Sequence, residues 1–469
     1  MLKIQLKMTL IKSISGIRGT IGGQVGDNLT PIDAVKFASA YGVWIKQQRN
    51  KEHYKVVVGR DARISGAMIQ NLVMNTLVGL GIHVVDLGLS TTPTVELAVP
   101  MEHADGGIIL TASHNPKQWN ALKLLNSKGE FLDGEEGAKI LEIAESDQMS
   151  FADVDSLGKI TKNKAYIDLH IIEVLDLDLV NVKAIEDARF KVVVDGVNST
   201  GGIAIPLLLE RLGVHVVKLY CEPNGEFPHN PEPLKEHLTD LSERVVKEGA
   251  DFGIVVDPDV DRLAFMDENG EMFGEEYTLV ACADYVLSRT PGNTVSNMSS
   301  TRALRDVTEK YGGTYEASAV GEVNVVKLMK KNKVVIGGEG NGGIIYPESH
   351  YGRDALVGVA LFLSLLADKQ ISVSALRKTY PNYFMSKKKI ELTPGLDVDG
   401  ILKEIETRYH NEQLTTVDGV KIDFSESWVH LRKSNTEPII RIYTEAKSQL
   451  EADTLADKFI EEIGAIAKS

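Results

Sequence analysis

The sequence predicts an α/β protein of several domains, with mixed, mostly parallel sheets and a different, α+β module at the C-terminal end. Two observations carry this prediction. Short, continuous apolar strands rich in Val and Ile alternate with helical patterns, as is typical of strands buried on both faces of a sheet. The length of 469 residues corresponds to about two to four domains of ordinary size.

Strands and helices alternate along most of the chain. Strands are expected at 54–59, 82–87, 107–110, 190–194, 214–219, 252–256 and 332–336. Helices are expected at 67–79, 203–212 and 355–366. Three such rounds predict three similar α/β domains, which we place at 1–155, 156–262 and 263–375.

The pattern changes near residue 376. A strand, a helix at 398–409, strands at 417–424, 428–433 and 439–445, and a closing helix at 450–466 follow one another. Consecutive strands bracketed by helices predict an α+β domain with an antiparallel sheet at 376–469.

Composition excludes several classes of protein. With 43% hydrophobic and 25% charged residues the chain is neither collagen-like nor wholly disordered. A net charge of −15 argues against nucleic acid and anionic membranes as partners, although a local basic pocket can still bind a small anion. The longest nearly apolar stretch, 355–367, is shorter than the ~20 residues that a bilayer span needs.

The N-terminus and the cysteines point to a cytoplasmic protein. Residues 1–8 lack the apolar segment of a secretory signal, and we interpret residues 1–7 as an upstream start ahead of Met8. Cys221 and Cys282 form neither a disulfide framework nor a CxxC metal motif. Two isolated buried thiols are favoured over a single bridge.

Four polar loops follow strand ends, where ligands bind in open α/β sheets. The first is Thr111-Ala112-Ser113-His114-Asn115-Pro116. A hydroxyl group held at a strand end between turn formers is well placed to act as a nucleophile. Taken alone, the loop fits a turn capped by Thr111 and Ser113 better.

The second loop is Asp257-Pro258-Asp259-Val260-Asp261-Arg262. Its three carboxylates point one way if the loop stays extended, and such a cluster needs a hard cation to remain ionised. An EF-hand would use Asp257, Asp259, Asp261 and Glu268, but Arg262 stands at its sixth position, where the turn needs Gly. We therefore predict a Mg²⁺ site, with a solvated acidic turn as the alternative.

The third loop is Gly337-Gly338-Glu339-Gly340-Asn341-Gly342-Gly343, expected after a strand at 334–336. Its glycines allow a ligand to approach the backbone closely. Glu339 and Asn341 offer an acceptor and an amide suited to sugar hydroxyls. A merely flexible turn is equally consistent with these residues.

The fourth loop is Arg432-Lys433-Ser434-Asn435-Thr436-Glu437-Pro438, with Arg441 beyond it. Cations, hydroxyls and an amide between two strands predict a phosphate-binding site, and a polar hairpin turn is the alternative. Together the four loops describe phosphoryl transfer: a hydroxyl that accepts phosphate, a metal, a sugar clamp and a distal phosphate anchor.

In this order the four loops resemble those of the α-D-phosphohexomutases, the superfamily of phosphoglucomutase, phosphomannomutase and phosphoglucosamine mutase. Further matching segments are Ser15-Gly16-Ile17-Arg18-Gly19, Val58-Gly59-Arg60-Asp61-Ala62-Arg63, Val194-Asp195-Gly196-Val197-Asn198 and Pro223-Asn224-Gly225-Glu226-Phe227-Pro228. The resemblance spans nearly the whole chain. It implies three similar α/β domains and a fourth α+β domain arranged around a central cleft.

The resemblance also implies roles for individual residues. Ser113 would be the phosphorylated serine, and Asp257, Asp259 and Asp261 would bind Mg²⁺ together with a phosphate oxygen on Ser113. Arg262 would contact the phosphoryl group, and Arg18, His114 and Lys123 would line the reacting end. Glu339 and Asn341 would bind the sugar, and the distal phosphate would be held by Arg432, Ser434, Asn435, Thr436 and Arg441. The implied partners are a phosphosugar and its hexose 1,6-bisphosphate, which is both intermediate and activator, in a monomer or homodimer.

Two departures from the family pattern matter. Gly343 stands where bacterial relatives usually carry a histidine, and Glu322 replaces a second one. Lys123, Arg18 and His114 are therefore the candidates for the general acid or base. The Glu-Gly-Asn-Gly-Gly loop looks most like archaeal-type phosphoglucosamine mutases, which favours glucosamine phosphate over glucose or mannose phosphate. A sugar phosphatase and a non-catalytic sugar-phosphate or Ca²⁺-binding protein are the remaining alternatives.

Overall fold

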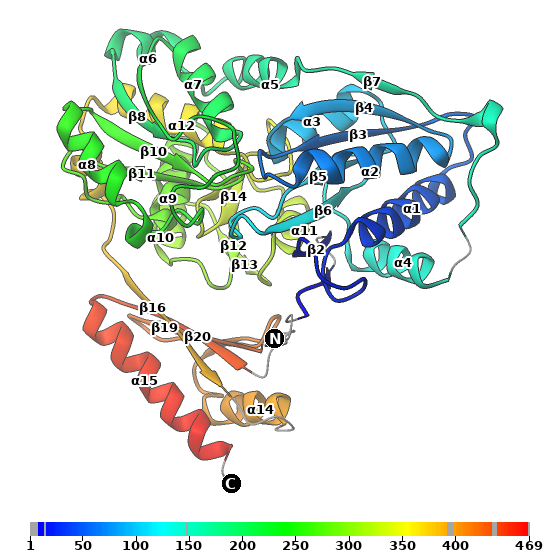
Figure 1. Ribbon diagram of the computed structural model, residues 1–469. Coiled ribbons are helices and arrows are strands. Elements are labelled where there is room, and N and C mark those ends of the chain that lie inside the picture. Colours follow the sequence, from blue (N-terminus) through cyan, green and yellow to red (C-terminus); the bar gives the residue numbers. More distant parts are fainter. Residues whose placement is uncertain (1–7, 14–15, 147–148, 392–396, 434–438, 468–469) are drawn as a thin grey trace, which may run out of the picture. The chain divides into compact units, whose positions relative to one another are not determined.

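A computed structural model describes residues 8–13, 16–146, 149–391, 397–433 and 439–467 (Figure 1). The chain forms two compact units. The first consists of Met1–Thr278 and Gly342–Ser374, and the second of Leu279–Asn341 and Ala375–Ser469. Within the described residues no helix is both long enough and apolar enough to cross a membrane.

The first unit begins with a seven-stranded mixed sheet in the order β1-β2-β6-β5-β3-β4-β7. Four of its strands are mutually parallel, and β1, β2 and β6 run antiparallel to their neighbours. The strands are β1 (Ile11–Ser13), β2 (Gly16–Thr20), β3 (Tyr54–Arg60), β4 (Ile82–Leu89), β5 (Gly106–Leu110), β6 (Trp119–Leu125) and β7 (Ile160–Lys162).

Alternating side chains of β3 bury both faces of this sheet. Val56 and Val58 pack in one apolar cluster with α1 (Pro31–Gln48), α2 (Gly66–Gly79) and α4 (Gly134–Glu145). Val57 packs in another with α3 (Thr92–Met101). Helices on both faces explain why these strands are continuously apolar.

A four-stranded sheet in the order β11-β10-β8-β9 follows in the same unit. β8, β9 and β10 are parallel and β11 is antiparallel. Its strands are β8 (Lys191–Asp195), β9 (His215–Leu219), β10 (Phe252–Val256) and β11 (Leu263–Met266). The helices of this region are α5 (Tyr166–Leu175), α6 (Val182–Ala188), α7 (Gly201–Arg211) and α8 (Thr239–Glu248).

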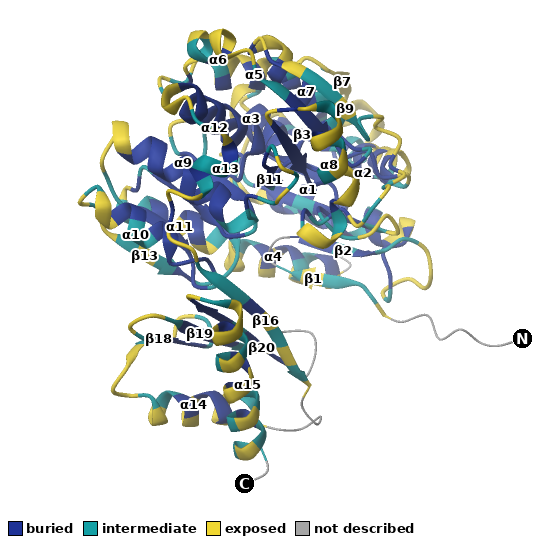
Figure 2. Cartoon of the chain, turned by 90° about the vertical axis from the view of Figure 1, so that its left-hand side faces the viewer, coloured by how far each residue is buried: buried dark blue, intermediate teal, exposed yellow. Residues whose placement is uncertain are grey.

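The later segment of the first unit returns to this sheet. After β15 (Gly343–Ile345), α12 (Ala355–Lys369) is buried over almost its whole length (Figure 2). The ring of Phe362 stacks on that of Phe265 in β11, with their centroids 3.7 Å apart. The strongly apolar stretch around 355–367 is thus a core helix, as its length requires.

The second unit contains parallel strands in the order β13-β12-β14 and a separate antiparallel sheet in the order β16-β20-β19-β18-β17. The first group comprises β12 (Thr294–Asn297), β13 (Tyr315–Ser318) and β14 (Ile336–Glu339), with α10 (Ala303–Lys310) and α11 (Glu322–Asn332). Helices α9 (Glu275–Arg289) and α13 (Val373–Arg377) lie in sequence at the transitions between the two units. The antiparallel sheet comprises β16 (Phe384–Glu391), β17 (Gln413–Thr415), β18 (Val420–Asp423), β19 (Trp428–Lys433) and β20 (Ile439–Ala446), packed against α14 (Val398–Arg408) and α15 (Gln449–Ile466).

Most of the expected elements are confirmed, but three expectations are wrong. The strand expected at 332–336 begins only at Ile336, because Asn332 still belongs to α11. The strand expected at 417–424 starts at Val420, because Gly419 adopts a left-handed turn conformation with φ of 74°. Cys221 is a free thiol that is only partly buried, whereas Cys282 is buried.

Candidate active site

Ser113 is held in an unusual backbone conformation just after β5. Its φ is 49°, in the left-handed region that costs a residue with a side chain about 1–3 kcal/mol. The Thr111 hydroxyl accepts the Ser113 N–H at 2.9 Å and donates to Asp61 at 2.7 Å. Thr111 therefore organises the turn, whereas Ser113, only 7% exposed, keeps its own hydroxyl for another partner.

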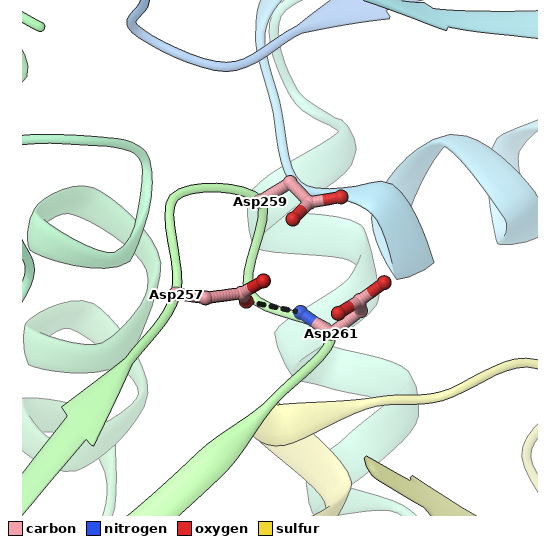
Figure 3. A group of neighbouring side chains, drawn as sticks. All are labelled: Asp257, Asp259 and Asp261. Atoms are coloured by element: carbon pink, nitrogen blue, oxygen red, sulfur yellow. Dashed lines mark hydrogen bonds between the residues drawn. The ribbon is translucent and has the colours of Figure 1, made fainter. Parts of the chain in front are cut away.

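The acidic loop after β10 is a tight turn, so the carboxylates do not meet through the extended backbone that their alternating positions would require. The N–H of Val260 donates to the carbonyl of Asp257 at 3.1 Å, and Val260 has a φ of 65°. The Asp257 carboxylate accepts the N–H of Asp261 at 3.2 Å (Figure 3). The turn nevertheless brings one oxygen from each of Asp257, Asp259 and Asp261 within 4.8 Å of one another.

A hydrogen bond joins the serine loop to this acidic turn. The Ser113 hydroxyl donates to Oδ2 of Asp257 at 2.6 Å, although the two residues are 144 positions apart in sequence. Both side chains are buried. The expected nucleophile and the expected metal ligands therefore lie in one site.

The unsatisfied oxygens of this site fit a hard cation. Oδ1 of Asp259 and Oδ1 of Asp261 are buried and have no hydrogen-bond partner among the described residues. Buried carboxylate oxygens without partners are costly unless an ion coordinates them. Three carboxylates that leave ligand positions for water and a phosphate oxygen are the kind of site that Mg²⁺ prefers.

The remaining oxygens are held by residues from distant segments. Oδ2 of Asp259 accepts the Thr92 hydroxyl at 2.5 Å and the Lys123 ammonium at 2.7 Å. Oδ2 of Asp261 accepts Arg353 at 2.7 Å and Lys123 at 3.3 Å. Neither Thr92 nor Arg353 was among the residues expected from the sequence. Arg353 follows no predicted strand, whereas Thr92 lies in the polar run Ser90-Thr91-Thr92 after β4, so the rule of polar residues at strand ends could have found it.

The buried charges shift one another's ionisation. Burial raises the pKa of Asp257, and the neighbouring Asp259 and Asp261 raise it further. Burial acts in the same direction on Asp261, but Arg353 and Lys123 outweigh it and lower the pKa of that carboxyl. Although burial opposes it, the two carboxylates Asp259 and Asp261 raise the pKa of Lys123, so this lysine stays charged.

Three further residues expected at the reacting end lie in the same unit. Nδ1 of His114 is 3.2 Å from the Ser113 hydroxyl, and burial, with the charge of Arg262, lowers the pKa of His114 to about 2. Burial and Arg262 also lower the pKa of Arg18 in β2. The Arg262 N–H donates to Asp257, while its guanidinium pairs with Glu232 at 3.2 Å. Glu232 is a partner that the sequence did not reveal.

In the second unit, the glycine-rich segment is partly a strand. Gly337 and Gly338 lie in β14, and a Cβ on Gly337 would come within 2.6 Å of the Val295 carbonyl oxygen, which only glycine avoids. The loop expected at 337–343 is thus shorter than predicted. Glu339, at the end of β14, is 4% exposed.

Neighbouring polar groups fix Glu339. Its Oε1 accepts the amide of Asn297 at 2.8 Å and the N–H of Gly321 at 3.2 Å. The Ser300 hydroxyl accepts the N–H of Gly340 at 3.0 Å. Asn297 is the last residue of β12 and Ser300 follows this strand. Because no strand was expected at 294–297, the rule of polar residues at strand ends did not point to them. Asn341 follows this hydrogen-bonded segment.

Basic side chains line up on the antiparallel sheet. Arg432 in β19 lies opposite Arg441 in β20, which in turn lies opposite Lys389 in β16. The guanidinium of Arg432 is oriented by Asp418, with Nε 2.8 Å from Oδ2 of that residue. Adjacent like charges repel unless an anion bridges them, so this row fits a phosphate group. Ser434, Asn435 and Thr436 lie outside the described residues.

A buried network of charged groups surrounds His350 and Asp354, the neighbours of Arg353 in the chain. The His350 ring nitrogens lie 3.3 Å from Glu96 and 3.2 Å from Asp354. Asp354 also accepts His170 at 2.8 Å and caps α12. The segment 350–354 is therefore fixed on one side, while Arg353 reaches Asp261 on the other.

This network predicts a loss of stability at alkaline pH. Burial alone would lower the pKa of His350, but its hydrogen bonds to Asp354 and Glu96 raise it from 6.5 to about 10. Because the pKa of His350 is higher in the folded than in the unfolded protein, the protonated ring stabilises the fold fully below about pH 6.5. This contribution is lost as the pH rises toward 10. Urea unfolding should give a smaller free energy of unfolding at pH 9.5 than at pH 6.5 in the native protein. The difference between the two pH values should be smaller in His350→Gln. The exposed His410→Gln variant is the control, and an equal slope in all three proteins would contradict the assignment.

Comparisons with known proteins agree with this arrangement. Models of the family described as phosphoglucomutase/phosphomannomutase match alpha/beta/alpha domain I at 10–150, domain II at 165–270, domain III at 274–383 and the C-terminal domain at 386–462. These matches give the four-domain α/β architecture expected from the sequence; the exact domain boundaries stay a prediction.

Individual proteins match over nearly their whole length. The chain is 36% identical over 443 residues to a phosphoglucomutase/phosphomannomutase from Thermococcus kodakarensis, covering 92% of this chain and 95% of that protein. It is 32% identical to a probable phosphoglucosamine mutase from Methanopyrus kandleri, covering 95% and 96%. A crystal structure of a phosphoglucomutase/phosphomannomutase family protein from Burkholderia thailandensis aligns with a TM-score of 0.84 at 25% identity and covers 98% of each chain.

These proteins share both the order of the domains and the length of the chain. A match of this extent, on all four domains, cannot arise from a shared fold alone, and the relatives carry the names of mutases that act on phosphosugars. The chain therefore belongs to the phosphoglucomutase/phosphomannomutase family of phosphohexomutases and is an isomerase.

Proposed function

We propose that this phosphohexomutase interconverts glucosamine 6-phosphate and glucosamine 1-phosphate through a phosphorylated Ser113. The observation that carries the proposal is the 2.6 Å hydrogen bond from the Ser113 hydroxyl to Asp257, beside two carboxylates with open buried oxygens. A hydroxyl at a cation site is suited to storing and releasing a phosphoryl group.

In the proposed first half-reaction, the P–O bond of phosphoserine breaks and a P–O bond to a free sugar hydroxyl forms. The hydroxyl loses its proton, and Ser113 recovers one. The resulting hexose 1,6-bisphosphate rotates end over end in the site. It then returns its other phosphoryl group to Ser113 by the reverse step. A Mg²⁺ held by Asp257, Asp259 and Asp261 would neutralise charge on the phosphoryl and serine oxygens.

The charge states of Lys123, Arg18 and His114 indicate which role each of them has in the proposed reaction. Lys123 and Arg18 are cations that stabilise phosphoryl charge, and the raised pKa of Lys123 makes it a poor base. His114 is neutral, and its ring nitrogen lies 3.2 Å from the Ser113 hydroxyl. We therefore infer that the His114 ring orients the Ser113 hydroxyl, because a pKa of about 2 makes it too weak a base to hold the proton.

The sugar preference rests on the third loop and on the relatives. Glu339 is held rigidly by Asn297 and Gly321, so it presents a fixed carboxylate near Asn341. A fixed anion suits a substrate with an ammonium group. Relatives carry the names of both phosphoglucosamine mutases and phosphoglucomutase/phosphomannomutases, so glucose and mannose phosphates are the competing substrates.

The test of this preference is kcat/KM for the 6-phosphates of glucosamine, glucose and mannose, with the matching 1,6-bisphosphate present. We expect glucosamine 6-phosphate to be favoured at least about 10-fold, because hydrogen-bonded sites discriminate strongly. A larger value for glucose or mannose phosphate would refute the preference while leaving the mutase reaction intact. Release of inorganic phosphate as the main product would instead identify a sugar phosphatase, and no turnover at all would favour a binding protein.

The basic row on the antiparallel sheet predicts the effect of Arg432→Ala. We expect KM for the phosphosugar to rise about 10- to 100-fold with little change in kcat, since a charge-assisted hydrogen bond to phosphate contributes about 1.5–3 kcal/mol. Arg408→Ala, which removes an exposed arginine paired with Glu404 on α14, is the control. An unchanged KM in Arg432→Ala would show that the distal phosphate binds elsewhere.

A further inference from the structure

A buried arginine outside the four polar loops donates hydrogen bonds to the serine loop. Arg63 lies in the turn between β3 and α2, and its side chain is 0% exposed. A guanidinium has five N–H donors, and each has an acceptor at hydrogen-bond distance here. The acceptors are Oδ2 of Asp61 at 3.0 Å and the carbonyls of Ser113 at 2.5 Å, Asn115 at 2.6 Å, Pro116 at 2.8 Å and Trp119 at 3.0 Å.

The same turn fixes both backbone polar groups of Ser113. Arg63 holds the Ser113 carbonyl directly. Asp61 holds the Ser113 N–H indirectly, because it accepts the Thr111 hydroxyl that in turn accepts that N–H. The left-handed conformation of Ser113, which aims its hydroxyl at Asp257, is thus fixed from both sides by an adjacent Asp61–Arg63 ion pair.

The turn is also tied to the acidic loop. Between the two charged residues, the N–H of Ala62 donates to the Ser199 hydroxyl at 3.2 Å, and that hydroxyl donates to the carbonyl of Pro258 at 2.7 Å. Pro258 lies between Asp257 and Asp259. One turn is therefore bonded directly to the loop that carries the nucleophile and, through Ser199, to the loop that carries the metal ligands.

A third segment covers the guanidinium. The ring centroid of Phe227 lies 5.1 Å from Cζ of Arg63, at the distance of a cation–π contact. Gly225 packs directly on this turn, since a Cβ there would come within 2.2 Å of the Ala62 carbonyl oxygen. The segment 223–228, one of those that match the family, thereby closes the site around Arg63.

We propose that Arg63 is a positioning residue that sets the direction of the Ser113 hydroxyl relative to Asp257 without touching the reacting atoms. The inference rests on the proposed role of Ser113 as phosphoryl carrier. It requires a five-donor group rather than merely a positive charge, because four carbonyls and a carboxylate oxygen each accept a separate N–H of the guanidinium. Lysine, with three donors on a point charge, cannot reproduce this pattern.

The test compares native protein with Arg63→Lys. We expect kcat to fall about 100-fold while KM for the hexose phosphate stays within about 3-fold, because a displacement of about 1 Å of a reacting group has an effect of that size. Guanidinium ions at low, non-denaturing concentration should restore part of kcat in Arg63→Ala, and tetramethylammonium ions should not. A full kcat in Arg63→Lys, or equal effects of both ions, would overturn the inference.

A matched control separates positioning from general stability. Arg302, in the second unit, is also buried and donates to the carbonyls of Phe424, Ser425 and Ser427. Arg302→Lys should lower the melting temperature comparably to Arg63→Lys but leave kcat within about 3-fold, and an equal loss of kcat in both variants would overturn the inference.

The phosphate content of Ser113 in the native protein distinguishes the two proposals. Mass spectrometry should find phosphate on Ser113 after incubation with hexose 1,6-bisphosphate. If Ser113 carries phosphate and Arg63→Lys turns over normally, only the role of Arg63 fails. If Ser113 carries none during turnover, the proposed function fails and the inference fails with it.

Discussion

Ser113→Ala should abolish isomerisation, lowering kcat by at least about 10⁴-fold, because no other described hydroxyl donates to the acidic turn from the serine loop. The fold should be retained. Alanine can take the same place after β5, and the backbone bonds that Thr111 and Arg63 make to this residue do not involve its side chain. The coupled assay for hexose 6-phosphate measures the first effect, and thermal unfolding followed by circular dichroism measures the second.

The matched control is Ser364→Ala. Ser364 is a buried serine on α12 whose hydroxyl donates to the Ala360 carbonyl and accepts the N–H of Asn181. This variant should lose about 1 kcal/mol of unfolding free energy and keep its activity. Near-normal turnover in Ser113→Ala, or equal inactivation of both variants, would remove Ser113 from the reaction.

Asp259→Asn should weaken metal binding and catalysis together. The change leaves an acceptor for Thr92 and Lys123 but removes the negative charge, so we expect divalent-metal affinity to fall at least about 100-fold and kcat to fall with it. Titration with Mn²⁺ followed by electron paramagnetic resonance measures metal binding directly, without reference to activity.

A carboxylate outside the acidic turn provides the comparison for Asp259→Asn. Asp267 accepts backbone N–H groups of Asn269 and Glu271 in a surface turn. Asp267→Asn should destabilise the turn slightly and leave Mn²⁺ affinity unchanged. If Asp259→Asn bound Mn²⁺ as tightly as the native protein does, the metal would have to lie elsewhere.

Local patterns predicted the strands and helices that carry the site. The continuous apolar run at 252–256 is β10, and the strand expected at 428–433 is β19. Such runs are informative because burial on both faces of a sheet, or packing against helices, leaves little choice of side chain. The glycines at 337–338 misled the prediction because glycine marks both flexible loops and strands that another backbone approaches closely.

Most of the residues that complete the site could not be predicted from local sequence patterns. Thr92, Arg353 and Glu232 contact Asp259, Asp261 and Arg262 across separations of 30 to 167 positions in sequence. No periodicity or turn pattern distinguishes Arg353 and Glu232 from ordinary polar residues, whereas Thr92 follows a predicted strand. The turn at Val260 was also missed, because a β-branched residue rarely takes positive φ and only surrounding contacts hold it there.

The ion pairs that Lys123 and Arg353 make with Asp259 and Asp261 have a consequence for chelation. Lys123 and Arg353 offset the charges of Asp259 and Asp261, so removing divalent ions with EDTA leaves the repulsion mainly on Asp257, whose raised pKa favours uptake of a proton. The stripped enzyme should be inactive yet melt within a few degrees of the loaded one, and it should recover at the speed of ion uptake, without a refolding step.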